Sequence, residues 1–194
     1  MADSNRSRSG RTGVHFKSEE LKDMIEQEDR LPDPCNDRKV KEVRPPPNRP
    51  LSLDRVFPMK DFRTRNDTPD LELLKAYLVE QGSLSKELMQ HLIDETKTVF
   101  RKEPNLHRID GSVVIIGDIH GQFTDMMSMF SKLRQPGGSH NTIYLFLGDY
   151  VDRGEFGCEV MGYLMALKLM YPKNIFMLRG NHETREMTTS FNFR

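Results

Sequence analysis

Three short polar clusters in the second half of the chain combine residue types that can bind metal ions. Each follows an apolar run, and GDIHG, with Asp118 and His120, comes after VVII. GDYVDRG, with Asp149, comes after IYLFL, and RGNHE, with Asn181, comes after IFML. Carboxylate, imidazole and amide groups without a thiolate suit ions such as Mn, Fe or Zn rather than a structural cysteine–zinc site. These four residues are therefore predicted to be metal ligands.

The other polar residues of the clusters suit phosphoryl transfer. Asp149, on the middle strand, is the candidate for a carboxylate that bridges two ions, and such a pair can activate a water for in-line displacement at phosphorus. Arg153 can hold phosphate oxygens through its planar guanidinium. His182 can donate a proton to the leaving oxygen, and Asp152 can hold its imidazole in position. Arg153, His182 and Asp152 are the predicted catalytic groups.

Each cluster by itself also has a structural explanation. GDIHG could be a strand-end turn, GDYVDRG could be a loop with an internal salt bridge, and RGNHE is equally ambiguous. Their occurrence together, about one strand–helix unit apart, favours the functional interpretation. Arg179 and Glu183 are expected to be supporting or structural partners, and Cys158 a packing residue. Ordinary surface or core positions are expected for the histidines outside the clusters, which are His91, His107 and His140.

Apolar runs and helical patterns alternate through this half of the chain. Continuous apolar segments that end near glycine predict three buried strands, at 112–118, 142–149 and 174–180. Apolar residues at helical spacing predict helices at 122–133 and at about 156–170. The predicted fold class is therefore α/β, with a β-α-β-α-β unit and a parallel sheet. Right-handed crossovers would bring the carboxyl ends of the strands, and with them the three clusters, to one edge of the sheet.

A helical hairpin is predicted before the first strand. Thr68 is a candidate N-cap with Pro69 at the first helical position, and Gly82 is a natural stop for this helix. A second helix is predicted from near Ser85. Its apolar positions at helical spacing are Leu88, Leu92, Ile93, Thr96, Val99 and Phe100.

Residues 1–50 are predicted to be a disordered extension or linker. FKSEELKDMIEQEDRL, at 16–31, could form a short charged helix. RPPPNRP, at 44–50, favours polyproline II, either as a stiff linker or as a docking ligand for an aromatic groove. The predicted organisation is thus an extension over 1–50, a helical segment over 51–111 and the first half of a catalytic core over 112–194.

The composition bears on the compartment and the partners. Of the 194 residues 36% are hydrophobic and 30% charged, and Lys+Arg and Asp+Glu both total 29. No net charge therefore argues for nucleic acid or a membrane surface as a partner. Cys35 and Cys158 form no disulfide framework, and no apolar run approaches the length of a membrane span. A cytoplasmic protein is expected, with the nucleus as a further compartment.

GDIHGQF, LFLGDYVDRG and LRGNHE together resemble the signature segments of the serine/threonine phosphoprotein phosphatases of the metallophosphoesterase superfamily. Within that family the likeness is greatest to the calcineurin catalytic A subunits. DRKVKEVRPPPNRPLSLDRVF, LLKAYLVEQGSLSKEL and TREMTTSFNF carry this closer likeness. The resemblance covers about residues 37–194 and is strongest from Ser112 onward.

The resemblance implies a β-sandwich flanked by helices and the hydrolysis of phosphoserine and phosphothreonine in proteins. It implies that Asp118 and His120 bind one ion and Asn181 the other, with Asp149 shared. It gives the three catalytic groups named above the same roles. The implied metals are iron and zinc, or manganese. The implied partners are phosphoprotein substrates, a calcineurin B-type regulatory subunit and calmodulin.

The family's fold, as the resemblance implies it, continues beyond Arg194 with two more metal-ligand histidines, another phosphate-binding arginine and the second half of the sandwich. The segments that bind calcineurin B and calmodulin also lie downstream in the family. The isolated chain is therefore expected to hydrolyse phosphopeptides negligibly and to leave a strand edge and an apolar sheet face uncovered. Two alternatives stay open: a non-catalytic truncated binding fragment, and another metallophosphoesterase.

Overall fold

The computed structural model describes residues 47, 49–58, 68–137, 140–191 and 193, all within one compact unit over Arg44–Arg194. Most of the extension predicted over 1–50, including the charged segment 16–31 and much of the proline-rich stretch, lies outside the described residues. The division at residues 50 and 111 stays a prediction. None of the described helices is long and apolar enough to cross a membrane.

Three parallel strands form the sheet, in the order β1-β2-β3. They are β1 (Val113–Ile116), β2 (Ile143–Phe146) and β3 (Ile175–Met177). Val114 pairs with Tyr144, which pairs in turn with Ile175 on β3. The α/β fold with a parallel β-α-β-α-β unit is thus confirmed, with strands shorter than the apolar runs that predicted them.

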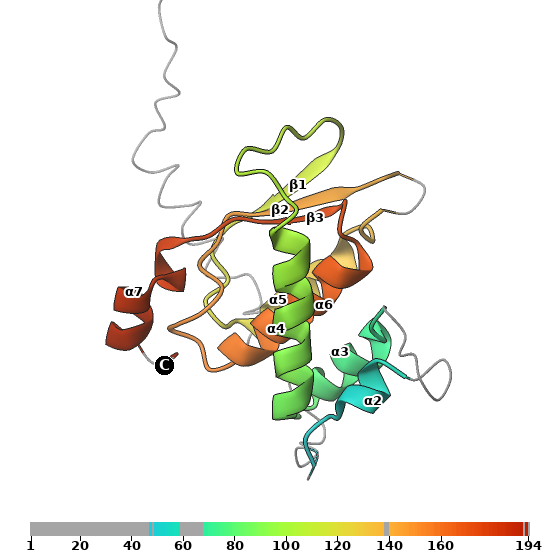
Figure 1. Cartoon of the computed structure of the whole chain (residues 1–194), viewed down its shortest axis with the longest axis vertical. Helices are drawn as coiled ribbons and strands as arrows, with labels where there is room; N and C mark the ends of the chain where they lie inside the picture. The colour runs from blue at the N-terminus through green and yellow to red at the C-terminus, as the bar shows by residue number, and fades with distance from the viewer. Residues whose placement is uncertain (1–46, 48, 59–67, 138–139, 192, 194) are drawn as a thin grey trace, which may run out of the picture. The chain divides into compact units, whose positions relative to one another are not determined.

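The crossover helices α5 (Phe123–Lys132) and α6 (Gly157–Met170) lie on the same side of the sheet (Figure 1). On α5 the buried side chains are Phe123, Met126 and Met127, which recur at helical spacing. Helix α6 is buried over most of its length because it contacts α3, α4, α5 and β3. A helix that is apolar on all sides is typical of such a central position.

Lys168 is the one charged side chain of α6 that is fully buried among the described residues. Its ammonium pairs with the Glu103 carboxylate. It also donates to the carbonyls of Pro172, at 3.0 Å, and Ile175, at 2.6 Å. These bonds satisfy the ammonium and tie α6 to β3 and to the segment that follows α4.

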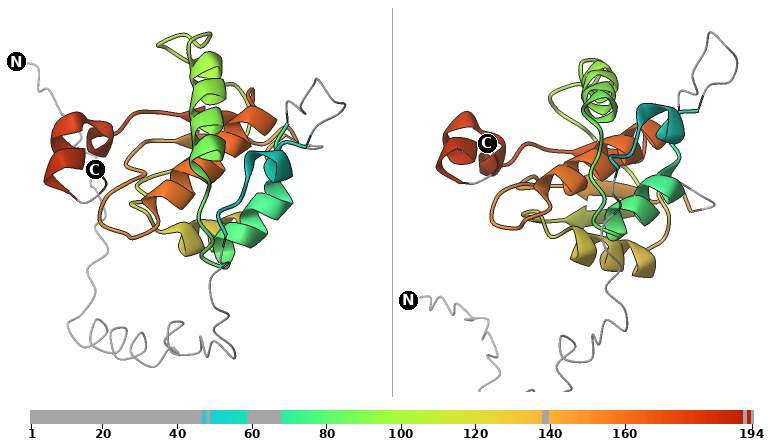
Figure 2. Two further views of the ribbon diagram at one scale, coloured as in Figure 1. Left: turned by 60° about the horizontal axis from the view of Figure 1, so that its bottom comes forward. Right: turned by 90° about the horizontal axis from the view of Figure 1, so that it is seen from below.

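None of the described helices covers the opposite face of the sheet (Figures 1 and 2). Ile115, which pairs with Leu145 across the sheet, is 64% exposed. Leu147 and Leu178, just past the ends of β2 and β3, are exposed as well. Within the part of the chain that the structure describes, the predicted apolar sheet face is therefore uncovered.

Helix α3 (Leu71–Val79) begins and ends at other residues than predicted. The predicted N-cap, Thr68, is wrong, because the Asp70 side chain accepts the hydrogen bond from the Leu73 amide, at 2.9 Å. The stop at Gly82 is wrong in detail: Gln81 takes the left-handed conformation, with φ of 60°. The Gln81 and Gly82 amides donate back to Leu78 and Tyr77, at 3.0 Å each, which is a Schellman motif.

Helix α4 (Lys86–Phe100) begins as predicted, with Ser85 as its N-cap. Leu88, Leu92 and Thr96 are its buried residues, whereas Ile93 and Phe100 are exposed. The apolar periodicity does not distinguish the buried from the exposed residues of this helix, because both sets recur at helical spacing. A short helix, α2 (Leu53–Val56), was not predicted.

Candidate metal centre

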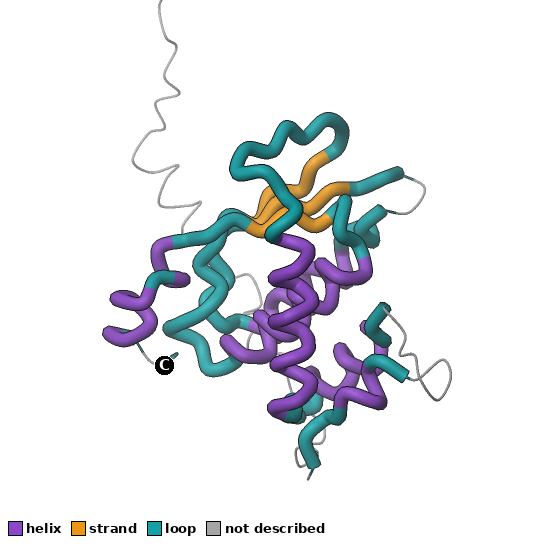
Figure 3. The backbone as a smooth tube through the Cα atoms, viewed as in Figure 1, coloured by secondary structure: helices purple, strands orange, loops and turns teal. Residues whose placement is uncertain are grey.

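The three polar clusters meet at the carboxyl end of the sheet and are joined by backbone hydrogen bonds. The tube in Figure 3 shows the loops after the three strands running side by side there. The Ile119 and His120 amides donate to the Asp149 carbonyl, at 3.0 and 2.9 Å. The Gly154 amide donates to the His120 carbonyl, at 2.9 Å. These backbone hydrogen bonds therefore hold the first two loops in a fixed mutual position.

Four non-glycine residues of these loops have a positive φ. The values are 46° for His120, 56° for Asp149, 67° for Asp152 and 66° for Arg153. This region is sparsely populated by residues with a Cβ atom, and residues held there concentrate at functional sites. All four were predicted as site residues from their chemistry alone.

His120 is buried and leaves one ring nitrogen without a partner. Its Nδ1 lies 2.8 Å from the Val151 carbonyl, which can only accept, so Nδ1 carries a hydrogen. Its Nε2 is buried and has no hydrogen bond. The nearest carboxylate oxygen, Oδ2 of Asp118, is 3.5 Å from it. With Nδ1 protonated in a neutral ring, Nε2 and the Asp118 oxygen are both acceptors, and a cation can bind to both of them.

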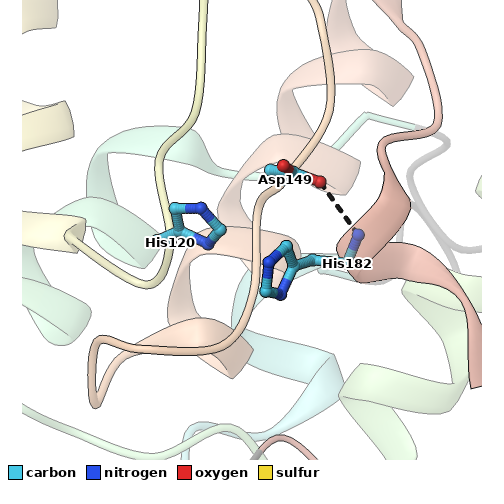
Figure 4. A group of neighbouring side chains, drawn as sticks. All are labelled: His120, Asp149 and His182. Atoms are coloured by element: carbon cyan, nitrogen blue, oxygen red, sulfur yellow. Dashed lines mark hydrogen bonds between the residues drawn. The ribbon is translucent and has the colours of Figure 1, made fainter. Parts of the chain in front are cut away.

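Asp149 connects the second cluster to the third. Its Oδ1 accepts a hydrogen bond from the His182 amide, at 2.9 Å, as Figure 4 shows. The Asp149 amide in turn donates to the Glu183 carboxylate, at 2.8 Å. Glu183 also accepts from the Tyr150 amide, at 2.8 Å, and from the Gly180 amide, at 3.0 Å. One carboxylate thus binds three amides from two loops.

His182 lies in the short 3-10 helix η1 (Asn181–Glu183), and its ring is buried. Its Nδ1 is 2.9 Å from Oδ2 of the buried Asp152. The ring also makes an edge contact with the His120 ring, with centroids 4.6 Å apart. Because Asp152 engages Nδ1, Nε2 is the nitrogen that remains for a proton or a ligand.

The structure brings His120, Asp149 and His182 together, with one potential ligand atom from each within 4.8 Å of the others. Of the remaining predicted residues, Asp152 is buried beside His182, and the other three are at the surface. The Asp118 side chain is 63% exposed beside His120. Asn181 and Arg153 are exposed as well, and the only hydrogen bonds to Asn181 in the described part of the chain reach its backbone carbonyl.

The donor set fits a divalent cation. Two imidazoles and two carboxylates without a thiolate suit Mn, Fe or Zn. The buried Nε2 of His120 is an unpaired polar atom of the kind that an ion would satisfy. Asp118, His120, Asp149 and His182 are the residues that the geometry offers to such an ion.

Of three supporting contacts of the site, two have no signal in the sequence, whereas Arg179 and Glu183 were expected to be supporting partners. The Val151 carbonyl fixes the His120 ring, although an apolar side chain gives no hint of it. The Arg179 guanidinium donates to the Glu183 carbonyl, at 3.1 and 3.2 Å. The Tyr150 hydroxyl donates to the Leu178 carbonyl, at 2.8 Å. Burial, with Glu183 and Asp149 nearby, raises the pKa of the Tyr150 phenol well above its usual value.

The residues predicted to be ordinary lie outside the centre. His91 packs edge-on against Phe57, and His107 against Phe176. Cys158 is not the packing residue that was expected, because it is exposed. Burial and the neighbouring Glu159 raise the pKa of its thiol, which keeps it protonated and weakly nucleophilic.

Comparison with known proteins agrees with this geometry. Residues 111–193 match the sequence pattern of the family described as calcineurin-like phosphoesterase. These residues belong to the calcineurin-like phosphoesterase family. The family segment contains all three strands and all three loops of the centre.

Several curated relatives of this family are serine/threonine-protein phosphatases. The 2B catalytic subunits A2 and A1 of Saccharomyces cerevisiae are 39% and 40% identical over 66% and 69% of this chain. The PP2A-like phosphatase PPG1 of Candida albicans is 44% identical over 57%. The chain spans 21%, 24% and 26% of the lengths of these three relatives.

A solved structure supports the same assignment. It is a serine/threonine phosphatase from Saccharomyces cerevisiae with similarity to human phosphatase PP5. Its sequence is 36% identical to this chain and the TM-score is 0.54. The match covers 60% of this chain and 38% of the solved chain.

Proposed function

We propose that residues 111–193 contribute to the active site of a metal-dependent serine/threonine protein phosphatase. The observation that carries the proposal is the buried, unpaired Nε2 of His120 beside Asp118, in one cluster with Asp149 and His182. The names of the relatives support phosphoprotein substrates, with phosphoserine and phosphothreonine as the reacting groups.

The proposed roles follow the side-chain contacts of His120, Asp149 and His182, and the resemblance for Asn181 and Arg153. Asp118, His120, Asp149 and Asn181 would hold the ions, which are iron and zinc by resemblance, with manganese as an alternative. His182 belongs to the same geometric cluster but is reserved here for proton transfer. When bound, a pair of such ions polarises a phosphate oxygen and an attacking water. His182, oriented by Asp152 at Nδ1, delivers a proton from Nε2 to the leaving oxygen. The exposed Arg153 guanidinium binds the phosphate.

The regulatory partners and the compartment belong to the same proposal. A calcineurin B-type subunit and calmodulin are the partners that the resemblance suggests. The proposed location of the protein is the cytoplasm, with the nucleus as a further compartment.

Metal binding is the first test. Calorimetric titration of the chain with Mn²⁺ is expected to show binding that Asp149→Asn weakens at least about tenfold. Asp110→Asn removes an exposed carboxylate away from the clusters and is expected to change nothing. Equal affinity in both variants would place the ion elsewhere and remove the basis of the proposal.

Anion binding tests the reaction class. Inorganic phosphate is expected to bind only in the presence of Mn²⁺, and Arg153→Ala is expected to weaken it by about tenfold. Any turnover by the chain is expected to favour phosphoserine peptides over bis-phosphodiesters. The reverse preference would indicate another metallophosphoesterase, and metal binding without phosphate binding would favour a non-catalytic fragment.

A further inference from the structure

Helix α7 (Arg185–Ser190) follows η1 and has no buried residue. Figure 1 shows it set apart from the other described helices. A helix of six residues is not stable by itself in water, and this one buries no side chain that would hold it in place. Contacts beyond its end do so, because Phe191 and Phe193 pack against the proposed proton donor and its partner.

The Phe191 ring covers the imidazole of His182. The centroids of the two rings are 4.9 Å apart, and their planes are inclined by 59°. The His120 ring also contacts this imidazole, at 4.6 Å. His182 is 2% exposed although Phe191 is 40% exposed, so Phe191 shields the imidazole from solvent. An imidazole packed between two rings has little room to turn.

The backbone amide of Phe193 holds the carboxylate that sets the His182 tautomer. Oδ1 of Asp152 accepts this amide, at 3.2 Å, and Oδ2 lies 2.9 Å from Nδ1 of His182. The Asp152 side chain is fully buried. Because each oxygen has its own partner, the carboxylate cannot rotate without breaking both hydrogen bonds.

Gly157, the first residue of α6, determines where Phe193 lies. A Cβ atom at Gly157 would be 3.0 and 3.2 Å from Cδ2 and Cε2 of the Phe193 ring. The ring therefore packs directly on the backbone at the start of α6, which only glycine permits at this distance. This contact anchors the Phe193 amide beside the loop that carries Asp152.

We propose that Phe191 and the Phe193 amide are positioning groups for proton transfer by His182, an inference that rests on the proposed function. The Phe191 ring fixes the plane of the imidazole. The Phe193 amide fixes the Asp152 carboxylate, which keeps a proton on Nδ1. Nε2 then remains as the nitrogen that faces the cluster with His120 and Asp149.

The position of the imidazole matters because a proton donor must lie within hydrogen-bond reach of the leaving oxygen. Neither Phe191 nor the Phe193 amide acts on the substrate in this account, since both act through His182. The amide bonds of Glu183 are made by its own carboxylate and do not involve either phenylalanine. Loss of the positioning contacts is therefore expected to release the imidazole while the loops stay in place.

The test is made by NMR on the full chain with ¹⁵N-labelled histidine, without metal or phosphate. His182→Gln identifies the signals of this imidazole. Two quantities are measured for it: the tautomer, from the imidazole ¹⁵N chemical shifts, and the rate at which the Nδ1 proton exchanges with water. The His120 signals are the internal reference, because Nδ1 of that ring bonds to the Val151 carbonyl instead.

Phe191→Ala is expected to speed exchange of the His182 Nδ1 proton at least about tenfold, because the imidazole loses its cover. The tautomer is expected to stay the same, since Asp152 keeps both of its partners. Phe191→Tyr is the conservative control. It keeps the ring, and the position is exposed enough for a hydroxyl to reach solvent, so exchange is expected to remain slow.

Phe193→Pro removes the amide hydrogen and is expected to give a mixture of His182 tautomers, because the Asp152 carboxylate is then free to turn. Phe193→Leu keeps the amide and an apolar side chain. It is expected to retain the proton on Nδ1. The His120 signals are expected to be the same in all four variants.

Each readout can overturn the proposal. An unchanged exchange rate in Phe191→Ala would show that this ring does not shield the imidazole. A single unchanged tautomer in Phe193→Pro would show that the amide does not hold Asp152. Equal changes in the His120 signals would show general loosening of the centre rather than positioning of one ring. Failure of the Mn²⁺ titration would instead overturn the proposed function, since neither readout involves the ion.

Discussion

Glu183 holds the loops of the candidate metal centre together through its carboxylate. Its carboxylate accepts the amides of Asp149, Tyr150 and Gly180, which come from two different loops. Hydrogen bonds to a charged acceptor are stronger than those between neutral groups. A residue adjacent to a predicted catalytic histidine thus supports the centre by holding backbone rather than by acting on a substrate.

Gly180 is required by close packing against Asp149. A Cβ atom at this position would overlap Oδ1 and the amide nitrogen of Asp149 and would lie 2.9 Å from its Cγ. Gly180→Ala is therefore expected to destabilise the chain by about 1–3 kcal/mol and to displace the carboxylate. Urea unfolding measures the first effect and Mn²⁺ titration the second.

Gly117→Ala is the matched control, since a Cβ atom there meets no heavy atom within 4 Å. It is expected to leave both measurements unchanged. Equal effects of the two substitutions would show that flexibility near the loops matters, rather than the contact with Asp149.

Asp152→Asn is expected to exchange the tautomer of His182. Oδ1 of Asp152 accepts the Phe193 amide, at 3.2 Å, so the asparagine oxygen takes that place and its NH₂ group faces Nδ1. Nδ1 must then accept, and the proton moves to Nε2. Imidazole ¹⁵N chemical shifts measure the exchange.

The His120 tautomer provides the internal control, because its Nδ1 bonds to a backbone carbonyl that this substitution leaves in place. An unchanged His182 spectrum in the Asp152→Asn variant would contradict the assigned hydrogen bond.

At the scale of elements, the structure decides which of two residues, Thr68 or Asp70, caps the start of α3. Asp70→Ala removes the side-chain acceptor for the Leu73 amide and is expected to destabilise the chain by about 1 kcal/mol. Thr68→Ala, at the cap predicted from the sequence, is expected to have no effect. Thermal or urea unfolding of the two variants measures the difference, and a larger loss at Thr68 would restore the original assignment.

The caps of α3 show why element ends are harder to predict than elements. Thr68 and Asp70 both have side-chain oxygens that can accept an amide, and only the path of the chain decides between them. In the same way, Gln81 rather than Gly82 takes the left-handed position, although glycine is the better residue for it. The apolar periodicity fixed the existence of α3, α4, α5 and α6 because a whole face contributes to it.

The candidate site was predictable to the extent that its chemistry is local in sequence. Residue types near the strand ends, together with the parallel topology, placed His120, Asp149 and His182 at one edge. The burial of each side chain was not predictable. Asp118 and His120 are only two positions apart, yet the Asp118 side chain is exposed and the His120 side chain is buried. Backbone partners such as the Val151 carbonyl leave no trace in residue type.

At the scale of the whole molecule, buried phenols make the folded state sensitive to alkali. Burial, followed by Glu72 and Tyr171, raises the pKa of Tyr163 to about 12. Burial also raises the pKa of Tyr144. The folded state therefore binds these protons more tightly than the unfolded chain, and this contribution is complete below about pH 10.

Stability is accordingly expected to fall as the pH rises from about 10 through 12, with Tyr163 accounting for at most about 2–3 kcal/mol. Urea unfolding across this range, followed with tyrosinate absorbance, measures the effect. Tyr163→Phe keeps the ring and is expected to reduce the alkaline loss. An identical pH dependence in this variant would contradict the role of this phenol.

The left-handed backbone at His120, Asp149, Asp152 and Arg153 has a consequence for any selection acting on this chain. At each of these positions the left-handed conformation costs a residue with a Cβ atom about 1 kcal/mol of stability, a cost that glycine does not have. A library screened for heat resistance alone should therefore drift toward glycine at these four positions and discard an imidazole, two carboxylates and a guanidinium. Stability and site chemistry therefore favour different residues at the same four positions. A screen that keeps both must select for metal binding as well as for heat resistance.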